Sequence, residues 1–418
     1  MDTYHIRGGY SLNGEVALSG AKNSILPVFA ASVVTGKQSR IINCPKISDV
    51  DNMRDILGML GCNVQEDGDA VLVDSARISE HTIGEALMST MRSSVFLAGP
   101  LLVRCGIAEI GKPGGCKIGA RPIDIHIETL KALGAEVGEN EGRVVLKASK
   151  LTGAHITLPF PSVGATENAM IAASCAEGET VLRNAAREPE IVDLQNFLNC
   201  CGANIKGAGT RTVMIKGVKE LHAAEYEIIP DRIEAGTFLC MAAATRGEVH
   251  IKNALPAHLE AISEALETIG CKVRTTDDGV WLKKAKHLAG TGKITTAPFP
   301  GFPTDLQPQF TAAVCAAGLD GIIREEIFEN RFGYTKELNK MGAGIEIRGK
   351  NAIITQGHFL RGNRIVAEDL RGGAALVTAA LAAEGESIVC GTEYIKRGYF
   401  ALDKKLRLLG ADIKEHDD

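Results

Sequence analysis

The stretch Leu133-Gly134-Ala135-Glu136-Val137 reveals how the chain is organised, because close variants of it recur along the whole sequence. Each copy has an apolar residue or cysteine, a glycine, a small residue, a variable position and then Val or Ile. The glycines, 68 to 73 residues apart, are Gly61, Gly134, Gly202, Gly270, Gly342 and Gly410. This recurrence predicts six structural repeats that together account for all 418 residues.

A second glycine marks each repeat, at the end of an Ala-rich apolar stretch. Sixteen residues before it stands a residue of a type favoured at helix N-caps, namely Gly20, Thr90, Ser162, Asp231, Asp305 or Asp369. Each repeat is therefore predicted to hold a first helix, buried and rich in small residues, and a second, amphipathic helix. The first marker glycine would end the second helix in the left-handed conformation. Val/Ile-rich runs such as 144–146 supply strands, so the fold class is α/β.

Size and composition narrow the class of protein. A chain of this length favours two or three domains, and the six repeats could stack as a solenoid or close into two globular domains of three. The net charge of −5 argues against a nucleic-acid partner. No apolar run approaches the roughly 18–20 residues of a membrane span, and the first residues lack a secretory signal pattern. The eleven cysteines are scattered without metal-binding spacing, so we expect a cytoplasmic protein with no metal.

Cations stand where helix starts are predicted, although the start of a helix favours anions. Lys22, Arg92 and Arg371 lie two residues after inferred caps, and Arg232 lies one residue after. Further cations precede the second helices, at Arg121, Arg331 and Arg397. Helix starts with added Lys or Arg bind phosphate or carboxylate, which favours an anionic substrate. The alternative is that these cations are solvent-facing residues on a surface turn.

One cysteine differs from the others in its surroundings. Cys116 lies in the glycine-rich segment 111–121, between Lys112, Lys117 and Arg121. Nearby cations lower a thiol pKa from about 8.5 toward neutrality, which suits a general acid near pH 7. The alternative is an incidental loop cysteine. Asp305 follows a Pro-rich loop, and helix capping is its simplest explanation.

At these residues the chain resembles the enolpyruvyl transferase family over essentially its full length. The segments that carry the resemblance are Ser19-Gly20-Ala21-Lys22-Asn23-Ser24, Pro113-Gly114-Gly115-Cys116, Arg121-Pro122-Ile123-Asp124-Ile125, Ser162-Val163-Gly164-Ala165, Pro303-Thr304-Asp305-Leu306, Glu329-Asn330-Arg331-Phe332, Asp369-Leu370-Arg371-Gly372 and Arg397-Gly398-Tyr399. The Cys116 segment is similar to that of members acting on UDP-N-acetylglucosamine, whereas the sister enzymes acting on shikimate 3-phosphate lack it.

The resemblance implies a fold of two similar inside-out α/β barrel-like domains, with helices inside and sheets outside. Each domain would contain three βαβαββ-type repeats. One domain would span residues 21–229, and the other would combine residues 1–20 with 230–418, so that the chain crosses between them twice. The active site is expected in the cleft between the domains.

The resemblance also implies enolpyruvyl transfer from phosphoenolpyruvate to the 3-hydroxyl of UDP-N-acetylglucosamine, without a cofactor or metal. Cys116 would be the general acid, could carry a covalent phosphoenolpyruvate adduct and would react with the epoxide fosfomycin, while Asp305 would be the base, with Lys22 and Arg397 also catalytic. The phosphoenolpyruvate contacts would be Lys22, Asn23, Arg121, Arg331, Arg371 and Arg397. The UDP-N-acetylglucosamine contacts would be Arg92, Arg121, Pro122, Ile123, Asp124, Ile125, Ser162, Val163, Gly164, Asp305 and Ile327.

Two alternatives remain at this point. One is a sister transferase with a shikimate-type acceptor, against which the Cys116 segment and Ser162-Val163-Gly164 argue. The other is a non-catalytic paralogue that binds UDP-sugar and regulates a partner.

Overall fold

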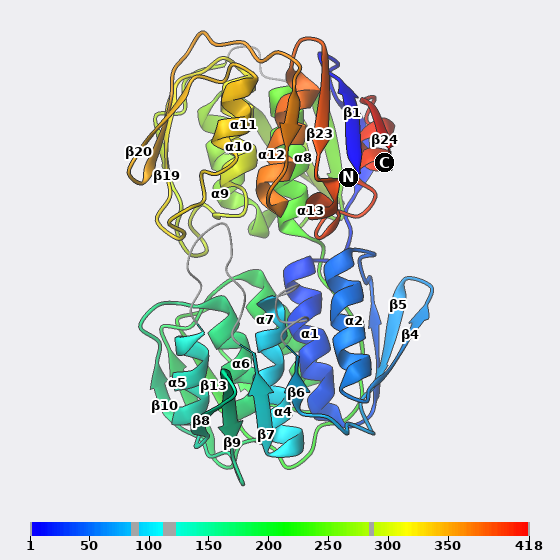
Figure 1. Ribbon diagram of the computed structural model, residues 1–418, viewed down its shortest axis with the longest axis vertical. Coiled ribbons are helices and arrows are strands. Elements are labelled where there is room, and N and C mark those ends of the chain that lie inside the picture. Colours follow the sequence, from blue (N-terminus) through cyan, green and yellow to red (C-terminus); the bar gives the residue numbers. More distant parts are fainter. Residues whose placement is uncertain (1, 85–91, 112–122, 284–287, 417–418) are drawn as a thin grey trace. The chain divides into compact units, whose positions relative to one another are not determined.

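The computed structural model describes residues 2–84, 92–111, 123–283 and 288–416, and the chain divides into two compact units (Figure 1). The first unit contains Met1–Ser19 and Pro230–Asp418. The second contains Gly20–Gly115 and Arg121–Ile229. The chain therefore passes from one unit to the other near Ser19 and again near Ile229.

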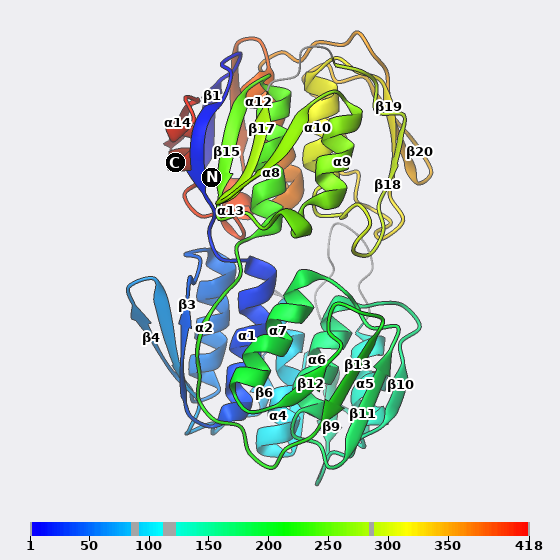
Figure 2. The same ribbon diagram turned by 180° about the vertical axis from the view of Figure 1, so that it is seen from behind.

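Within the described ranges, each unit has three four-stranded sheets outside its helices (Figures 1 and 2). The sheets of the second unit are β14(Glu225–Glu227)-β3(Gln38–Ile42)-β5(Ala70–Asp74)-β4(Asn63–Asp67), β6(Thr82–Ile83)-β7(Ile107–Ile110)-β9(Arg143–Lys147)-β8(Glu136–Asn140) and β10(His155–Thr157)-β11(Glu179–Arg183)-β13(Thr212–Lys216)-β12(Asn204–Lys206). Those of the first unit are β2(Asn13–Ala17)-β15(Glu248–Lys252)-β17(Gly279–Lys283)-β16(Lys272–Thr276), β18(Lys293–Thr295)-β19(Gly321–Arg324)-β21(Asn351–Ile354)-β20(Ile345–Arg348) and β22(Arg364–Val366)-β23(Glu386–Cys390)-β1(Thr3–Arg7)-β24(Asp412–His416). This arrangement confirms the inside-out fold predicted from the resemblance.

All six sheets share one pairing pattern. In the written order, the first two strands are parallel and the remaining pairs are antiparallel, as in β10-β11-β13-β12. A parallel neighbour requires a crossover connection, and in four of the sheets the first helix joins the two parallel strands directly, as α6 joins β10 to β11. Ile156, Leu182 and Val213 lie in one row across that sheet and are buried, so alternate residues of each strand face the helices.

The chain start completes sheets that belong to the later half of the sequence. β1 lies between β23 and β24, with Thr3 opposite Cys390 and His416. β2 pairs in parallel with β15, and β14 pairs in parallel with β3 of the first repeat. The βαβαββ repeat is therefore complete only when segments far apart in the sequence pair with one another.

The first helices form the core of each unit. They are α1(Lys22–Thr35), α4(Ala98–Cys105) and α6(Val163–Ala173) in the second unit, and α8(Arg232–Ala244), α10(Gln307–Ala316) and α12(Leu370–Ala382) in the first. Small residues let these helices approach closely: a Cβ added at Gly236 of α8 would lie 2.4 Å from the Leu306 side chain before α10. This contact explains the Ala- and Gly-rich composition.

The second helices are amphipathic, as α9 shows by burying Ile262, Ala265 and Leu266. They are α2(Ser48–Met59), α5(Asp124–Ala132) and α7(Pro189–Cys200) in the second unit, and α9(Glu260–Thr268), α11(Thr335–Lys340) and the pair α13(Thr392–Lys396) and α14(Leu402–Leu408) in the first. Short 3-10 turns precede α4, as η1(Arg92–Leu97), and α9, as η2(Pro256–His258).

The marker glycines behave as predicted. All six have φ between 91° and 101°, and each directly follows the C-cap residue of a second helix, as Gly61 follows Leu60. At Gly61 the backbone N–H bonds to Gly58 and that of Cys62 bonds to Leu57, which is the Schellman arrangement. The left-handed residue satisfies the last helical carbonyls and turns the chain into the next strand.

The N-cap predictions hold in part. Ser162, Asp231 and Asp369 accept backbone hydrogen bonds at the starts of α6, α8 and α12. Gly20 was wrong by one residue, because Ala21 precedes α1. Asp305 was also wrong, because α10 begins after Leu306 and has no side-chain cap. Thr90 lies outside the described residues.

Candidate active site

The most distinctive polar arrangement in the first unit is a carboxylate held between two arginines. Asp305 Oδ1 lies 2.9 Å from Arg331 Nη2, and its Oδ2 lies 3.2 Å from Arg371 Nη2. Both arginine side chains are almost fully buried, whereas the Asp305 side chain is 28% exposed. Each carboxylate oxygen is thus fixed by its own cation, and the group remains reachable from outside.

Three separate elements build this arrangement. Asp305 lies in the turn before α10, Arg331 lies in the loop before α11, and Arg371 is the second residue of α12. The capping explanation for Asp305 fails because its carboxylate pairs with side chains instead of capping α10. The structure therefore brings together three of the residues predicted from sequence.

Arg371 is also held from behind by a buried hydroxyl. Its Nη1 donates to the Tyr399 hydroxyl at 3.1 Å, and its guanidinium lies 5.4 Å from the centre of the Tyr399 ring. That hydroxyl also contacts Thr237 of α8 at 2.9 Å and accepts from Gln309 of α10 at 3.0 Å. The side chain of Arg371 is therefore tied to all three core helices of its unit.

The surroundings keep Arg371 charged despite its burial. Burial opposes the positive charge, but Tyr399, Asp305 and Asp231 outweigh it and raise the pKa of Arg371. Burial raises the pKa of Tyr399, which keeps its hydroxyl neutral and able to donate. A permanent positive charge inside the unit is suited to an anionic ligand group.

Arg397 does not start a continuous second helix, contrary to the prediction. The helical segment of the sixth repeat is broken, and Arg397 is the C-cap of α13 before α14 begins at Leu402. Its side chain is half-buried, two residues before Tyr399. Ile327, expected at the nucleotide, lies after β19 in the loop that leads to Arg331.

In the second unit, Lys22 begins α1 as predicted and Asn23 follows it. Lys22 Nζ lies 2.7 Å from Asp49 Oδ2, and the Asp49 side chain is only 2% exposed. Asp49 is the second residue of α2. A cation at the start of α1 is therefore balanced by an acid from the neighbouring helix.

The start of α6 approaches two other segments. Ser162 caps the helix by accepting from the Ala165 N–H at 3.3 Å. A Cβ added at Gly164 would lie 2.8 Å from both the His126 and Phe96 rings. Only glycine allows this close approach of α6 to α5 and η1, so Val163 and Gly164 lie beside the start of α5. There, Ile123 is buried, Asp124 is exposed and Ile125 is half-buried.

Some predicted residues cannot be placed. Cys116, Arg121 and Pro122 lie outside the described residues, as do Lys112 and Lys117. Arg92 begins η1, but its side chain is not described.

Three further residues were assigned no catalytic or binding role from the sequence. Asp49, in the first turn of α2, looks like an ordinary favourable charge at a helix start. Tyr399 reads as a core aromatic, and Glu325 as one of two successive surface acids after a strand. Only tertiary contacts distinguish them.

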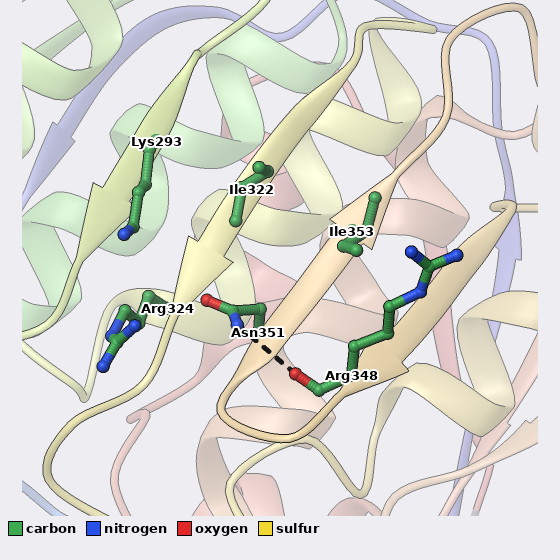
Figure 3. Close-up of a pocket in the computed structure, with 6 residues that line it drawn as sticks. All are labelled: Lys293, Ile322, Arg324, Arg348, Asn351 and Ile353. Carbon is green, nitrogen blue, oxygen red and sulfur yellow. Dashed lines mark hydrogen bonds between the residues drawn. The ribbon is translucent and has the colours of Figure 1, made fainter.

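A pocket of about 270 Å³ on the outer face of the β18-β19-β21-β20 sheet involves none of the predicted residues (Figure 3). It is lined by Lys293, Ile322, Arg324, Arg348, Asn351 and Ile353. Arg348 pairs with Glu346 at 2.7 Å and Arg324 pairs with Glu326, so glutamates already neutralise these cations. We therefore place the candidate site at the Asp305 arrangement instead.

No group of His, Cys, Asp and Glu in the described part of the chain could hold a metal ion. No helix among those residues is long and apolar enough to cross a membrane.

Comparisons with known proteins agree with this fold. The protein "UDP-N-acetylglucosamine 1-carboxyvinyltransferase 2" of Caldanaerobacter subterraneus subsp. tengcongensis is 50% identical over 413 residues, which are 99% of each chain. A protein named "UDP-N-acetylglucosamine 1-carboxyvinyltransferase" from Gloeobacter violaceus is 46% identical, over 98% of this chain and 90% of that one.

Solved structures show the same architecture. The enolpyruvyl transferase NikO from Streptomyces tendae matches with a TM-score of 0.88 at 26% identity, covering 99% of this chain and 98% of that one. EPSP synthase from Acinetobacter baumannii, with a TM-score of 0.74 at 18% identity and full coverage of both chains, shares the fold. The protein is thus a transferase with a two-unit inside-out α/β fold. It belongs to the EPSP synthase (3-phosphoshikimate 1-carboxyvinyltransferase) family, whose model matches residues 6–418.

Proposed function

We propose that this protein transfers the enolpyruvyl group of phosphoenolpyruvate to the 3-hydroxyl of UDP-N-acetylglucosamine and releases phosphate. The observation that carries the proposal is the 50% identity, over nearly the whole chain, to a protein named for this acceptor. In a cell, the reaction would be the first committed step of peptidoglycan synthesis, and we propose a cytoplasmic location.

The proposed reaction is an addition followed by an elimination. The Asp305 carboxylate takes the proton of the sugar hydroxyl, whose oxygen attacks C2 of phosphoenolpyruvate. C3 gains a proton from Cys116, which gives a tetrahedral intermediate. The C2–O bond to phosphate then breaks, C3 gives a proton back to the Cys116 thiolate, phosphate leaves and the double bond re-forms. The arrangement around Asp305 supports this role, because Arg331 and Arg371 stabilise its charged form and fix its position.

Cations replace a metal in this proposal. Phosphoenolpyruvate carries a phosphate and a carboxylate, for which Lys22, Asn23, Arg121, Arg331, Arg371 and Arg397 are the proposed contacts. The permanent charge of Arg371 suits the stabilisation of negative charge that develops as phosphate leaves. The covalent adduct and the reaction with fosfomycin at Cys116 belong to the same proposal.

The UDP-sugar would contact the remaining predicted residues. These are Arg92, Arg121, Pro122, Ile123, Asp124, Ile125, Ser162, Val163, Gly164, Asp305 and Ile327. The adjacency of the α5 and α6 starts supports this set, because backbone N–H groups at helix starts suit a diphosphate.

A phosphate-release assay with phosphoenolpyruvate and one of two acceptors tests the proposal. We expect release with UDP-N-acetylglucosamine and none above background with shikimate 3-phosphate. The reverse result would assign the shikimate-type acceptor. Binding of UDP-N-acetylglucosamine by calorimetry, without phosphate release, would favour the non-catalytic regulator.

A further inference from the structure

Glu325 is a buried carboxylate with four hydrogen bonds. It follows β19 directly and is only 2% exposed. Its Oε1 accepts from Thr296 Oγ1 at 2.9 Å, from the Ile327 N–H at 2.8 Å and from the Phe328 N–H at 3.1 Å. Its Oε2 accepts from Thr304 Oγ1 at 3.0 Å. A buried charge is costly unless it is satisfied in this way.

The hydrogen bonds of Glu325 reach both the segment that contains Asp305 and the segment that contains Arg331. Thr304 directly precedes Asp305, and its carbonyl oxygen accepts from Arg331 Nε at 3.4 Å and Nη2 at 3.2 Å. Ile327 and Phe328 begin the loop that carries Arg331, whose guanidinium lies 5.7 Å from the Phe328 ring centre. One carboxylate therefore fixes the turn that holds Asp305 and the loop that holds Arg331.

The other repeats show that the fold does not require a glutamate at this position. In four of the other five repeats, the residue after the corresponding second strand has φ between 53° and 79°; these residues are Asn43, Asn184, Asn253 and Gly391. In the remaining repeat it is Gly111. Asn43 and Asn184 each donate to the carbonyl of the residue after the first strand of their sheet, at 2.9 Å. Glu325 bonds to the equivalent residue, Thr296, through its hydroxyl, but it also reaches Thr304, Ile327 and Phe328.

We infer that Glu325 is a positioning residue for the proposed reaction: it holds Asp305, Arg331 and the Ile327 backbone in one fixed relation. The inference rests on the proposed function, since only that function gives Asp305 its proton-transfer role. An ordinary strand-end link would need only the contact that Asn43 and Asn184 make. The additional contacts are made with Thr304, which precedes Asp305, and with Ile327 and Phe328, which begin the loop that carries Arg331.

The variants Glu325→Leu and Glu325→Gln separate hydrogen bonding from mere filling of space. Leucine leaves the Ile327 and Phe328 N–H groups without their acceptor. Glutamine keeps an oxygen for these groups, and its amide can donate to the Thr304 hydroxyl. We expect kcat to fall on the order of 10²-fold in Glu325→Leu, the typical cost of misplacing catalytic groups by about 1 Å. Glu325→Gln should retain most of the wild-type kcat.

Asn253→Ala is the matched control. It changes the equivalent position of the fourth repeat, where the backbone has φ 61°. The Asn253 side chain makes no hydrogen bond to the described residues of the proposed site. It should lower Tm without changing kcat. If Glu325→Leu changes kcat no more than Asn253→Ala does, at temperatures well below both Tm values, the inference is wrong.

A measurement without substrate separates this inference from the proposed function. Amide hydrogen exchange at Ile327 and Phe328 should be faster in Glu325→Leu and near normal in Glu325→Gln. Unchanged exchange in both variants would overturn the inference. Absence of phosphate release by the wild type would overturn the proposed function and leave the exchange result standing. If Glu325→Leu does not fold, Thr304→Val removes only the Oε2 contact and should still lower kcat, and an unchanged kcat would overturn the inference.

Discussion

At the scale of single residues, the proposed site contains two kinds of group. The chemistry of some follows from the sequence around them, and the chemistry of others follows from residues that contact them only in the folded chain. A cysteine flanked by cations is suited to proton transfer wherever it lies in a fold. Asp305, by contrast, has an ordinary sequence setting and acquires its character from Arg331 and Arg371. Predictions for these two residues therefore rest on different grounds.

Cys116→Ser should abolish turnover, because a serine hydroxyl is far too weak an acid to protonate C3. Cys116→Asp should retain part of the activity, since a carboxyl can donate a proton, and should resist the epoxide. Phosphate release and covalent labelling measure the two effects. Near-normal turnover of the serine variant would remove Cys116 from the reaction.

Asp305→Asn should reduce kcat by at least ~10²-fold, the low end for acid–base catalysis. It should also lower Tm, because two buried arginines lose their negative partner. Steady-state kinetics and thermal unfolding of the same sample test both effects. An intact rate with a reduced Tm would leave Asp305 with a purely structural role.

Asp49→Asn removes the negative charge beside Lys22 while keeping the side-chain shape. We expect kcat/KM for phosphoenolpyruvate to fall about tenfold, equivalent to about 1.4 kcal/mol, because Lys22 loses its fixed position. Asp51→Asn is the control, since Asp51 lies on the same helix and is exposed. Equal effects of the two variants would contradict a positioning role for Asp49.

At the scale of elements, buried polar groups tie the core helices of each unit together. In the first unit, the Tyr399 hydroxyl contacts Thr237, Gln309 and Arg371 from three different helices. In the second, α6 carries Glu167, which is fully buried and whose Oε2 has no hydrogen-bond partner. The Tyr399 hydroxyl makes three hydrogen bonds whereas Glu167 Oε2 makes none, so the two residues should respond to substitution in opposite ways.

Tyr399→Phe should destabilise the protein by about 1–3 kcal/mol, the cost of leaving buried polar groups unsatisfied. It should also lower kcat, because Arg371 loses a contact. Tyr334→Phe is the matched control, since Tyr334 is also buried but its hydroxyl bonds to Gln307 at a longer distance of 3.3 Å and makes no hydrogen bond to any arginine that the structure describes. A similar loss of stability and of kcat in both variants would show that the hydrogen bonds of the Tyr399 hydroxyl have no special role.

Glu167→Gln should stabilise the protein at neutral and alkaline pH. Burial, followed by repulsion from Glu190 and Glu188, raises the pKa of Glu167 well above its usual value. Since the folded pKa exceeds the unfolded one, the folded state is favoured below about pH 4.5, and this advantage is lost as pH rises toward the folded pKa. The Tm difference between variant and wild type should therefore grow with pH. A constant difference would contradict it.

At the scale of the whole molecule, the two units differ in how the chain builds them. Among the described residues, the second unit takes all its residues from between 20 and 229, whereas the first needs residues 2–19 together with 230–416. β1 is an interior strand between β23 and β24, so its removal divides that sheet. Thr3 lies opposite His416, which places the two ends of the chain on adjacent strands.

Fragments of the chain should therefore behave differently. Residues 20–229 should fold alone and unfold cooperatively on heating, whereas residues 230–418 should not. Joining residue 418 to residue 1 through a short Gly-rich linker, so that the fragment runs from 230 to 418 and then from 1 to 19, should restore cooperative unfolding. Circular dichroism on heating measures the unfolding transition of each of the three fragments. Independent folding of 230–418 would show that β1 is dispensable.

The local features of this fold were readable from the sequence. The marker glycines predicted the helix ends, because only glycine readily adopts the left-handed conformation that closes a helix. The Ala-rich stretches predicted the core helices, because close helix packing requires small side chains. The cations at Lys22 and Arg371 were found because they stand where local stability alone would disfavour them.

Tertiary structure decided the rest. The sequence placed Asp305 as a helix cap, but side-chain partners 26 and 66 residues away give it a different role. The hydrogen bonds of Glu325 and Tyr399 could not be predicted from their neighbours in the sequence, since burial and hydrogen bonding depend on segments that meet only in the folded chain. Strand pairing likewise joins residues 3–7 to 386–390, a contact that no local pattern encodes. Conformation along the chain is a local property, whereas the electrostatic setting of a side chain is set by whatever the fold packs against it.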